Sequence, residues 1–340
     1  MRKLVFRIFL CTIPVMVYLG LNIYIDTFNI FHYDNIRITS AEPNKNYIKT
    51  RYITENPDQY NAFIFGSSRV ANIPVDGLIT GTAKGEALNW YNMTCSMSVP
   101  GEQLSILEEF ISSGVDVKAV IIGVDELSMS GTADVHYDDL MRKPYELYED
   151  NKLGFYYDYL IVKPEFSLLP EVLFEQNSES VIAEKNEFYN YGVAIANTDF
   201  SLGDKGTDLG VLECGEYTGG TTIEDMKKMV SLCDEEGIEL YVFTSPILES
   251  TYRNAVAMGY LDFLKDLSTV TGYINFSGLN DITTNTAYYF DSSHYRPVVG
   301  LEIENVIFGK ETADTDSFYG VRVNNENADD IIAGLELQLQ

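Results

Sequence analysis

The most informative segment of the chain is Ala62-Phe63-Ile64-Phe65-Gly66-Ser67-Ser68-Arg69, in which four apolar residues lead directly into a glycine and two serines. A short apolar run that ends at glycine is typical of a central strand in a parallel sheet. A serine after such a strand has its hydroxyl at the rim of the sheet, where backbone N–H groups of a following helix can stabilise an oxyanion. Gly-Ser-Ser is also ordinary turn and helix-cap chemistry. Taken alone, the stretch therefore predicts a strand and leaves the role of Ser68 open.

The same alternation of elements continues downstream. Further apolar runs predict strands at 88–93, 117–124, 238–243 and 273–276. Periodic apolar positions predict helices from Gly101, at 226–233, at 254–267 and from Pro297. This order predicts an α/β fold, with a mostly parallel sheet between two helical layers in a three-layer α/β/α sandwich. The carboxyl ends of parallel strands meet at one edge, so we expect Ser68, Met97 and Asp125 to lie on one rim.

Four regions follow from these patterns. Residues 61–311 form the predicted α/β domain, and 27–60 form a polar, aromatic-rich connector packed on it. Within the domain, about 128–220 is rich in Tyr, Phe, Asp and Glu and is interrupted by prolines. Such a stretch predicts an insertion or cap near the active-site edge. Residues 312–340 are predicted to be an acidic C-terminal tail.

Residues 1–26 predict an N-terminal transmembrane anchor. Basic residues among the first seven precede an apolar stretch from Ile8 to Ile25, close to the roughly 20 residues that cross a bilayer core. The charge pattern around it predicts a single pass through the cell membrane, with a cytoplasmic N-terminus and an extracytoplasmic catalytic domain. Residues 4–25 would then contact the lipid bilayer. A cleavable signal peptide shares the charged start, but no small-x-small site follows; a buried soluble helix is the other alternative.

Composition excludes some classes of function. The formal net charge of -28 argues against nucleic-acid binding, which needs a basic face. The 46% hydrophobic content is ample for a packed core. Outside the anchor, Cys95, Cys214 and Cys233 do not form a disulfide framework, although one pair remains possible. The sequence contains no Cys-x-x-Cys pair and no cluster of Cys and His residues with the spacing of a zinc site. We therefore predict no metal and no cofactor.

Any imidazole base must come from His32, His136 or His294, the only histidines in the chain. Asp291 precedes His294 by three residues, a spacing that can bring both onto one side of a turn. A carboxylate that accepts from Nδ1–H fixes the tautomer and leaves Nε2 free to take a serine proton. Taken alone, a capping aspartate beside a surface histidine explains this pair more simply. Because Ser68 closes the first strand and the Asp-His pair precedes the last helix, however, the three residues form a candidate triad.

Two motif blocks resemble those of the SGNH (GDSL-type) hydrolase superfamily. Phe65-Gly66-Ser67-Ser68 is similar to the Gly-Asp-Ser block, and Asp291-Ser292-Ser293-His294 to the Asp-x-x-His block. The resemblance covers roughly 62–309. It implies a flavodoxin-like sheet in an SGNH hydrolase fold, with Ser68 as nucleophile, His294 as base and Asp291 as its partner.

The intermediate blocks depart from the family pattern. Asn92 to Met97 stands where Asn-x-Gly-x-x-Gly is usual, which implies that the backbone N–H groups of Met97 and Ser68 form the oxyanion hole. Asp125 stands where an asparagine side chain usually binds the oxyanion, so its carboxylate must turn away, be protonated or yield to another donor. Arg69, Asn92 and Asp125 are possible substrate contacts. For Arg69, a structural ion pair is the alternative.

The anchor together with Gly-Ser-Ser-Arg and Asp-Ser-Ser-His-Tyr resembles the membrane-tethered SGNH proteins of cell-envelope modification, such as the D-alanyl transfer protein of teichoic-acid biosynthesis and alginate acetylation proteins. The resemblance implies a serine-dependent acyltransferase or esterase that adds or removes D-alanyl or acetyl groups on an envelope polysaccharide or teichoic-acid-like polymer. It also implies a membrane-bound O-acyltransferase as partner. The alternative is a non-catalytic accessory subunit that keeps the fold and binds the polymer or that acyltransferase.

Overall fold

A six-stranded, mostly parallel sheet lies at the centre of the computed structural model, which describes residues 2–75, 78, 81–82, 84–146, 151–192 and 199–340. Its strands are β1 (Ala62–Phe65), β2 (Trp90–Asn92), β3 (Ala119–Val124), β4 (Glu239–Thr244), β5 (Tyr273–Asn275) and β6 (Val321–Val323). Their order is β2-β1-β3-β4-β5-β6, and β6 alone runs antiparallel to its neighbour. The order of the first five strands is one of the two common doubly wound arrangements. The prediction of an α/β protein with a mostly parallel sheet is confirmed.

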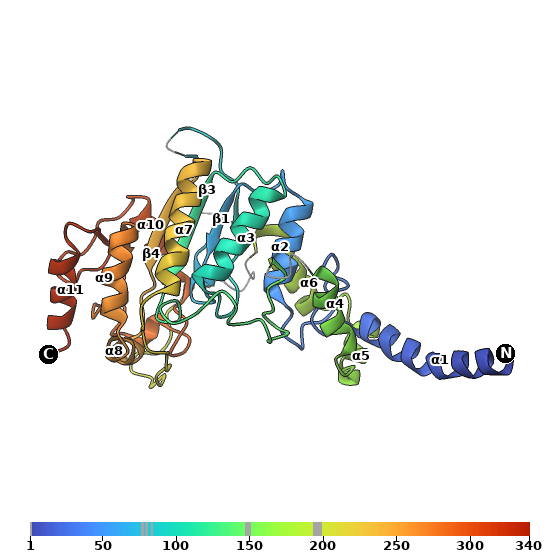
Figure 1. The fold of residues 1–340 in the computed structure, drawn as a ribbon. Helices are drawn as coiled ribbons and strands as arrows, with labels where there is room; N and C mark the ends of the chain where they lie inside the picture. The colour runs from blue at the N-terminus through green and yellow to red at the C-terminus, as the bar shows by residue number, and fades with distance from the viewer. Residues whose placement is uncertain (1, 76–77, 79–80, 83, 147–150, 193–198) are drawn as a thin grey trace.

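Apolar cores lie on both faces of this sheet because successive strand side chains point to opposite sides. Phe63 and Phe65 pack into the core beneath four helices, which are α3 (Pro100–Ser112), α7 (Thr221–Glu236), α9 (Tyr260–Val270) and α11 (Ala328–Leu337). Ala62 and Ile64 belong to a second core beneath α10 (Pro297–Ile307). This arrangement, visible in Figure 1, is consistent with a three-layer sandwich.

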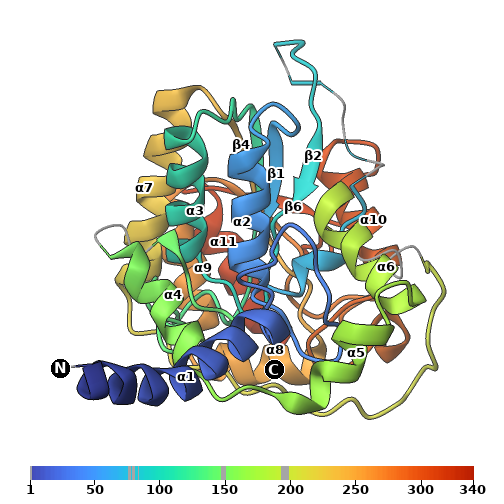
Figure 2. The same cartoon turned by 90° about the vertical axis from the view of Figure 1, so that its right-hand side faces the viewer.

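A second group of helices lies beside the sheet domain, at the end where α1 (Arg2–Ile25) extends from the body (Figures 1 and 2). It consists of α2 (Lys45–Glu55), α4 (Lys152–Ile161), the 3₁₀ turn η3 (Phe166–Leu168), α5 (Leu169–Phe174), α6 (Glu179–Asn186) and the π-helical turn η4 (Glu187–Tyr191). Tyr47 of the connector and Phe155 and Tyr159 of the insertion share one buried aromatic cluster. The connector and the insertion therefore fold together. Positions 147–150 and 193–198 of the insertion lie outside the described residues.

The stretch predicted as a membrane anchor forms the 24-residue helix α1. Among the described residues, no helix has the length and apolar character that crossing a membrane requires. The predicted span is therefore not confirmed and stays a prediction.

Two boundaries differ from the sequence-based predictions. The single helix expected at 254–267 is divided into α8 (Glu249–Ala257) and α9, because Gly259 between them has a left-handed φ of 95°. The residues expected to form an acidic tail instead contribute β6 and α11 to the fold. Val323 of β6 and Leu335 of α11 are fully buried in the core. The apolar positions between Ile331 and Leu339 indicate a short amphipathic end of this segment, and α11 forms there.

Candidate active site

Ser68 lies in a tight turn directly after β1, at the carboxyl edge of the sheet. The turn depends on Gly66, since a Cβ atom there would lie 2.5 Å from Val70 Cγ2 and 3.2 Å from the Gly123 carbonyl oxygen. The chain then forms only the short 3₁₀ turn η1 (Val70–Asn72). The α-helix expected after the serine is therefore not present, and a helix dipole cannot contribute at this position. Ser68 itself is partly exposed, as a nucleophile must be to meet a substrate.

The structure brings Ser68, His294 and Asp291 together in hydrogen-bonding contact. Ser68 Oγ lies 2.8 Å from His294 Nε2. On the other side of the ring, His294 Nδ1 lies 2.9 Å from Asp291 Oδ2 and 3.0 Å from Oδ1. With the Nδ1 proton donated to the carboxylate, Nε2 is free to accept the Ser68 proton. The distances meet the geometric requirement for a general base and its nucleophile.

A small hairpin-like loop positions the acid and the base. Phe290 N donates to the His294 carbonyl at 2.8 Å, which closes the loop around Asp291. Asp291 Oδ1 also accepts from the backbone N–H groups of Ser293 at 2.7 Å and His294 at 2.8 Å. Partial burial raises the pKa of Asp291, but the hydrogen bonds from His294 and Ser293 outweigh it and hold the pKa below its ordinary value. The carboxylate therefore remains ionised beside the imidazole.

Met97, whose N–H the sequence predicts as a second oxyanion donor, lies in the loop that follows β2. Its φ of 56° lies in the left-handed region, which glycine adopts readily and other residues adopt rarely. Its loop is tied to the nucleophile turn, since Cys95 N donates to the Gly66 carbonyl at 3.3 Å. Within the described part of the chain, the N–H groups of Ser68 and Met97 donate to no protein acceptor. In the described residues, a substrate oxygen would therefore displace no protein acceptor from either group.

The three possible substrate contacts, Arg69, Asn92 and Asp125, are all buried. Asn92 is 0% exposed, and its Oδ1 accepts from the Thr94 N–H at 3.0 Å. Arg69 is 1% exposed and pairs with Asp125 at 3.0 Å and with Glu126. Each of these side chains therefore has a structural role, and the substrate contacts suggested for them stay predictions. For Arg69, this role is the ion-pair alternative.

Asp125 anchors the nucleophile turn instead of facing an oxyanion. Its Oδ2 accepts from Ser67 Oγ and from Arg69 Nη1, and its Oδ1 accepts from the backbone N–H of Ser128 at 3.0 Å. Burial raises the pKa of Asp125, but the Arg69 charge and the hydrogen bonds from Ser67 and Ser128 hold the pKa below its ordinary value. Of the three outcomes open to a carboxylate at this position, turning away is the one observed.

Glu126 carries an opposite shift within the same cluster. Complete burial raises its pKa from 4.5 to about 7, although Arg69 acts against this. Its Oε2 is buried without a hydrogen-bond partner among the described residues, which adds to the free-energy cost of the ionised form. The nucleophile turn therefore rests on one carboxylate that stays ionised and one that titrates near neutrality.

Glu126→Gln is expected to flatten the pH dependence of the free energy of unfolding. Between the unfolded pKa of 4.5 and the folded pKa of about 7, only the folded chain holds the Glu126 proton. The free energy of unfolding of the unsubstituted chain should then fall as pH rises, by no more than about 1.4 kcal/mol per pH unit. Urea unfolding of both chains from pH 4.5 to 8 measures this slope. Identical slopes would show that Glu126 has no raised pKa.

Two basic side chains that sequence reasoning overlooked hold the loop that carries Met97. Lys49 of α2 is 1% exposed, and its ammonium donates to the carbonyl groups of Asn92, Thr94 and Gly192 at 2.8–3.1 Å. Arg142 Nη2 donates to Ser96 Oγ at 3.1 Å. Both residues come from the connector or the insertion, far from the loop in sequence. Neither has a motif by which it could have been recognised.

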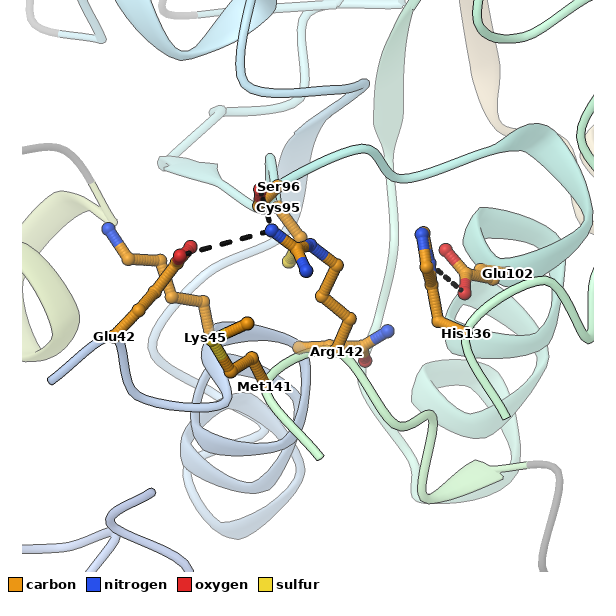
Figure 3. A pocket seen from close by; sticks show the side chains of 9 residues that line it. Glu42, Lys45, Cys95, Ser96, Glu102, His136, Met141 and Arg142 are labelled. Atoms are coloured by element: carbon orange, nitrogen blue, oxygen red, sulfur yellow. Dashed lines mark hydrogen bonds and ion pairs between the residues drawn. The ribbon is translucent and has the colours of Figure 1, made fainter. Parts of the chain in front are cut away.

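A small pocket lies beside this loop (Figure 3). Arg142 reaches between Glu42 and Ser96, and His136 pairs with Glu102 at 2.8 Å on one side of the same pocket. Its volume of about 10 Å³ has room for about one water molecule, so it cannot hold a polymer or an acyl chain. His136, and His32 at 3.0 Å from Asp26, both have structural partners.

Cysteines and possible metal ligands both occur among the described residues. Cys11, Cys95, Cys214 and Cys233 are all free thiols. Across the described ranges, no group of three His, Cys, Asp or Glu side chains is arranged to hold a metal ion. Burial raises the pKa of Cys95 to about 12, so this thiol stays protonated and weakly nucleophilic.

No protein-family model matches the chain. A search of the curated proteins finds no match either.

Proposed function

We propose that this protein is a serine-dependent acyl-transfer enzyme of the SGNH type, with Ser68 as nucleophile, His294 as general base and Asp291 as the group that orients it. The observation that carries the proposal is the continuous hydrogen-bonded path from Ser68 Oγ through both nitrogens of His294 to the Asp291 carboxylate. Ser68 and His294 are 226 residues apart in the sequence. Chance contact of a surface histidine with a turn serine does not account for the additional, oriented carboxylate.

The chemistry follows from this path. His294 Nε2 takes the Ser68 proton as Oγ attacks the carbonyl carbon of an ester or thioester, and the leaving alcohol or thiol then receives that proton. This step forms an acyl ester on Ser68. An acceptor hydroxyl loses its proton to His294, attacks the acyl carbon and releases Ser68, to which His294 returns the proton. Water as acceptor gives hydrolysis, and a sugar or polyol hydroxyl gives transfer.

The tetrahedral intermediate needs donors for its oxyanion. The N–H groups of Ser68 and Met97 are proposed for this role, which is supported by their lack of protein acceptors in the described residues. The orientation of Asp125 also supports it, because a carboxylate bonded to Ser67 and Arg69 does not repel the developing charge. Position 125 holds no asparagine to donate a third hydrogen bond, so the oxyanion would be stabilised by two backbone donors, whereas the SGNH pattern supplies three. The removal of one such donor costs about 2.7–4 kcal/mol of transition-state stabilisation.

A polymeric acyl acceptor or donor is proposed as the substrate, as the resemblance to envelope-modifying SGNH proteins implies. The openness of the site supports this proposal. The side chain of His294 is 35% exposed and that of Asp291 is 54% exposed, which suits a chain that approaches from outside. D-alanyl or acetyl groups on an envelope polysaccharide or teichoic-acid-like polymer, delivered with a membrane-bound O-acyltransferase, remain the proposed reaction.

Attachment to the extracytoplasmic side of the cell membrane through α1 belongs to the same proposal. Its support is the exposed apolar surface of this helix, where Phe6, Phe9 and Met16 are each more than 60% exposed. Side chains of this size are normally removed from water. A membrane would place the site near lipid-linked substrates.

Turnover of an activated acyl ester tests the proposed chemistry. With p-nitrophenyl acetate we expect a burst of one nitrophenolate per chain as Ser68 is acylated, followed by slower turnover that added glycerol accelerates. Absence of both burst and turnover would contradict the enzymatic proposal and favour an accessory subunit. Nitrophenolate can also be released without a burst, when acylation is slower than deacylation. The same samples are therefore treated with a fluorophosphonate, which reacts with the serine nucleophile and should abolish the turnover.

A further inference from the structure

Helix α4 is apolar on two opposite faces. Phe155 and Tyr159 are buried in the aromatic cluster that joins the connector and the insertion. Leu153, Tyr157 and Ile161 recur every four residues and are 83%, 59% and 50% exposed, so they form one stripe on the outer face. Packing of α4 against the domain uses only the face that carries Phe155 and Tyr159. Packing within the chain therefore does not explain the apolar side chains on the outer face.

The next elements along the chain, η3 and α5, carry further exposed apolar side chains. Phe166 of η3 is 53% exposed, and Leu173 and Phe174 of α5 are 50% and 82% exposed. Elsewhere in α5 the chain is packed normally, since Val172 is buried against Ile25 at the end of α1. We call the six exposed residues the α4–α5 surface; they are Leu153, Tyr157, Ile161, Phe166, Leu173 and Phe174.

Helix α1 fixes where this surface lies. Tyr18 Oη donates to the carbonyl groups of Ile161 and Val162 at 2.9 and 2.8 Å. Asn22 Nδ2 donates to the carbonyl groups of Leu160 and Val162 at 2.8 and 2.7 Å. Side chains of α1 thus satisfy carbonyl groups at the C-terminal end of α4 that lack helical partners. In Figures 1 and 2, α4 and α5 lie at the base of α1.

The exposed residues of α1 indicate what covers this part of the molecule. Val15, Met16 and Val17 are consecutive and are 56%, 69% and 55% exposed. Because successive helical residues point about 100° apart, these side chains face different directions. A helix that is apolar on all sides is covered by a large core or by a membrane, whereas a docked protein needs only one stripe. The contacts of Tyr18 and Asn22 hold α1 against the end of α4 at Ile161, which is one of the residues of the α4–α5 surface.

We propose that the α4–α5 surface lies in the interfacial region of a lipid bilayer, beside α1, and so holds the catalytic domain in a fixed orientation on the membrane. The inference rests on the proposed membrane attachment of α1. Exposed aromatic residues such as Tyr157, Phe166 and Phe174 suit the boundary between headgroups and acyl chains. The net charge of -28 disfavours anionic headgroups, so the lipid contact is apolar and does not require a negatively charged membrane.

Site-specific fluorescence tests the inference on the full chain in phosphatidylcholine vesicles. Every sample carries Cys214→Ser, which removes the partly exposed thiol outside α1. In one sample the environment-sensitive label is attached to the native Cys11 of α1, which is exposed. In the other samples Cys11→Ser is added, and the label is attached through Tyr157→Cys, Phe174→Cys or Leu337→Cys. Leu337 is 65% exposed, and its helix α11 lies at the opposite end of the molecule from α1 (Figure 1). It is the matched control.

We expect a blue-shifted emission and quenching by doxyl-labelled lipids at positions 11, 157 and 174, and neither effect at position 337. Quenching at 11 without quenching at 157 and 174 would overturn the inference and leave the attachment of α1 intact; it would indicate a protein partner for this surface. No quenching at 11 would contradict the attachment of α1 itself. Equal quenching at 337 would show non-specific adsorption and would also overturn the inference.

Discussion

Ser68→Ala is expected to lower ester turnover by about 10⁴-fold or more and to abolish labelling by a fluorophosphonate. The reason is that the Ser68 hydroxyl is the atom that forms the covalent intermediate, and the other members of a triad do not replace it. Turnover of p-nitrophenyl acetate and in-gel fluorescence measure the two losses. The overall fold should be unaffected, because within the described residues the Ser68 hydroxyl forms a hydrogen bond only with the His294 ring.

Ser293→Ala is the matched control for this substitution. It removes a hydroxyl from the same loop as His294 but keeps the backbone hydrogen bond that the Ser293 N–H donates to Asp291. We expect turnover and labelling close to those of the unsubstituted chain. Equal activity in the Ser68→Ala chain would place the nucleophile elsewhere and contradict the site described above.

Arg69→Met is expected to lower the free energy of unfolding by about 3–5 kcal/mol, because it leaves buried carboxylates without their cation. Arg69 is 1% exposed and contacts both Asp125 and Glu126, which are 0% exposed. Loss of the arginine also removes one of the contacts that hold Asp125, which anchors the turn through Ser67. Urea unfolding followed by circular dichroism measures the stability of the chain.

Arg253→Met provides the comparison at the surface. Arg253 pairs with Glu249 on the exposed side of α8, and its side chain is 46% exposed. Exposed pairs of this kind contribute about 0–1 kcal/mol, so the loss should be small. If Arg69→Met does not fold, Arg69→Lys keeps the charge without the two-armed geometry and is expected to fold with intermediate stability. Equal stability of the Arg69→Met and unsubstituted chains would contradict the assigned role.

Local patterns in the sequence predict the sheet and the spacing of its motifs. The apolar run before Gly66 forms β1, and the run that ends at Val124 forms β3. Because the carboxyl ends of parallel strands share an edge, the rim positions of Ser68 and Asp125 follow from the same reasoning. The spacing of Asp291 and His294 predicts their contact, but their approach to Ser68 depends on the whole topology.

The remaining features depend on contacts between distant segments. The sequence cannot show that Arg69 is buried, since an arginine after a turn is exposed in most proteins. Lys49 and Arg142 support the Met97 loop from segments 48 and 45 residues away from it, and their role is visible only after folding. The C-terminal strand β6 has three residues and depends on pairing with β5. Short strands of this kind have too little periodicity to be recognised.

Mass spectrometry of the acylated chain tests most directly whether Ser68 is the nucleophile. The chain is mixed with p-nitrophenyl acetate, quenched with acid within the burst and digested, and the peptides are sequenced. We predict one acetyl group per chain on Ser68, and little or none in the His294→Gln chain, where no base activates the serine. An acetyl group found on another residue, or no acetyl group on any peptide of a folded chain, would contradict the account.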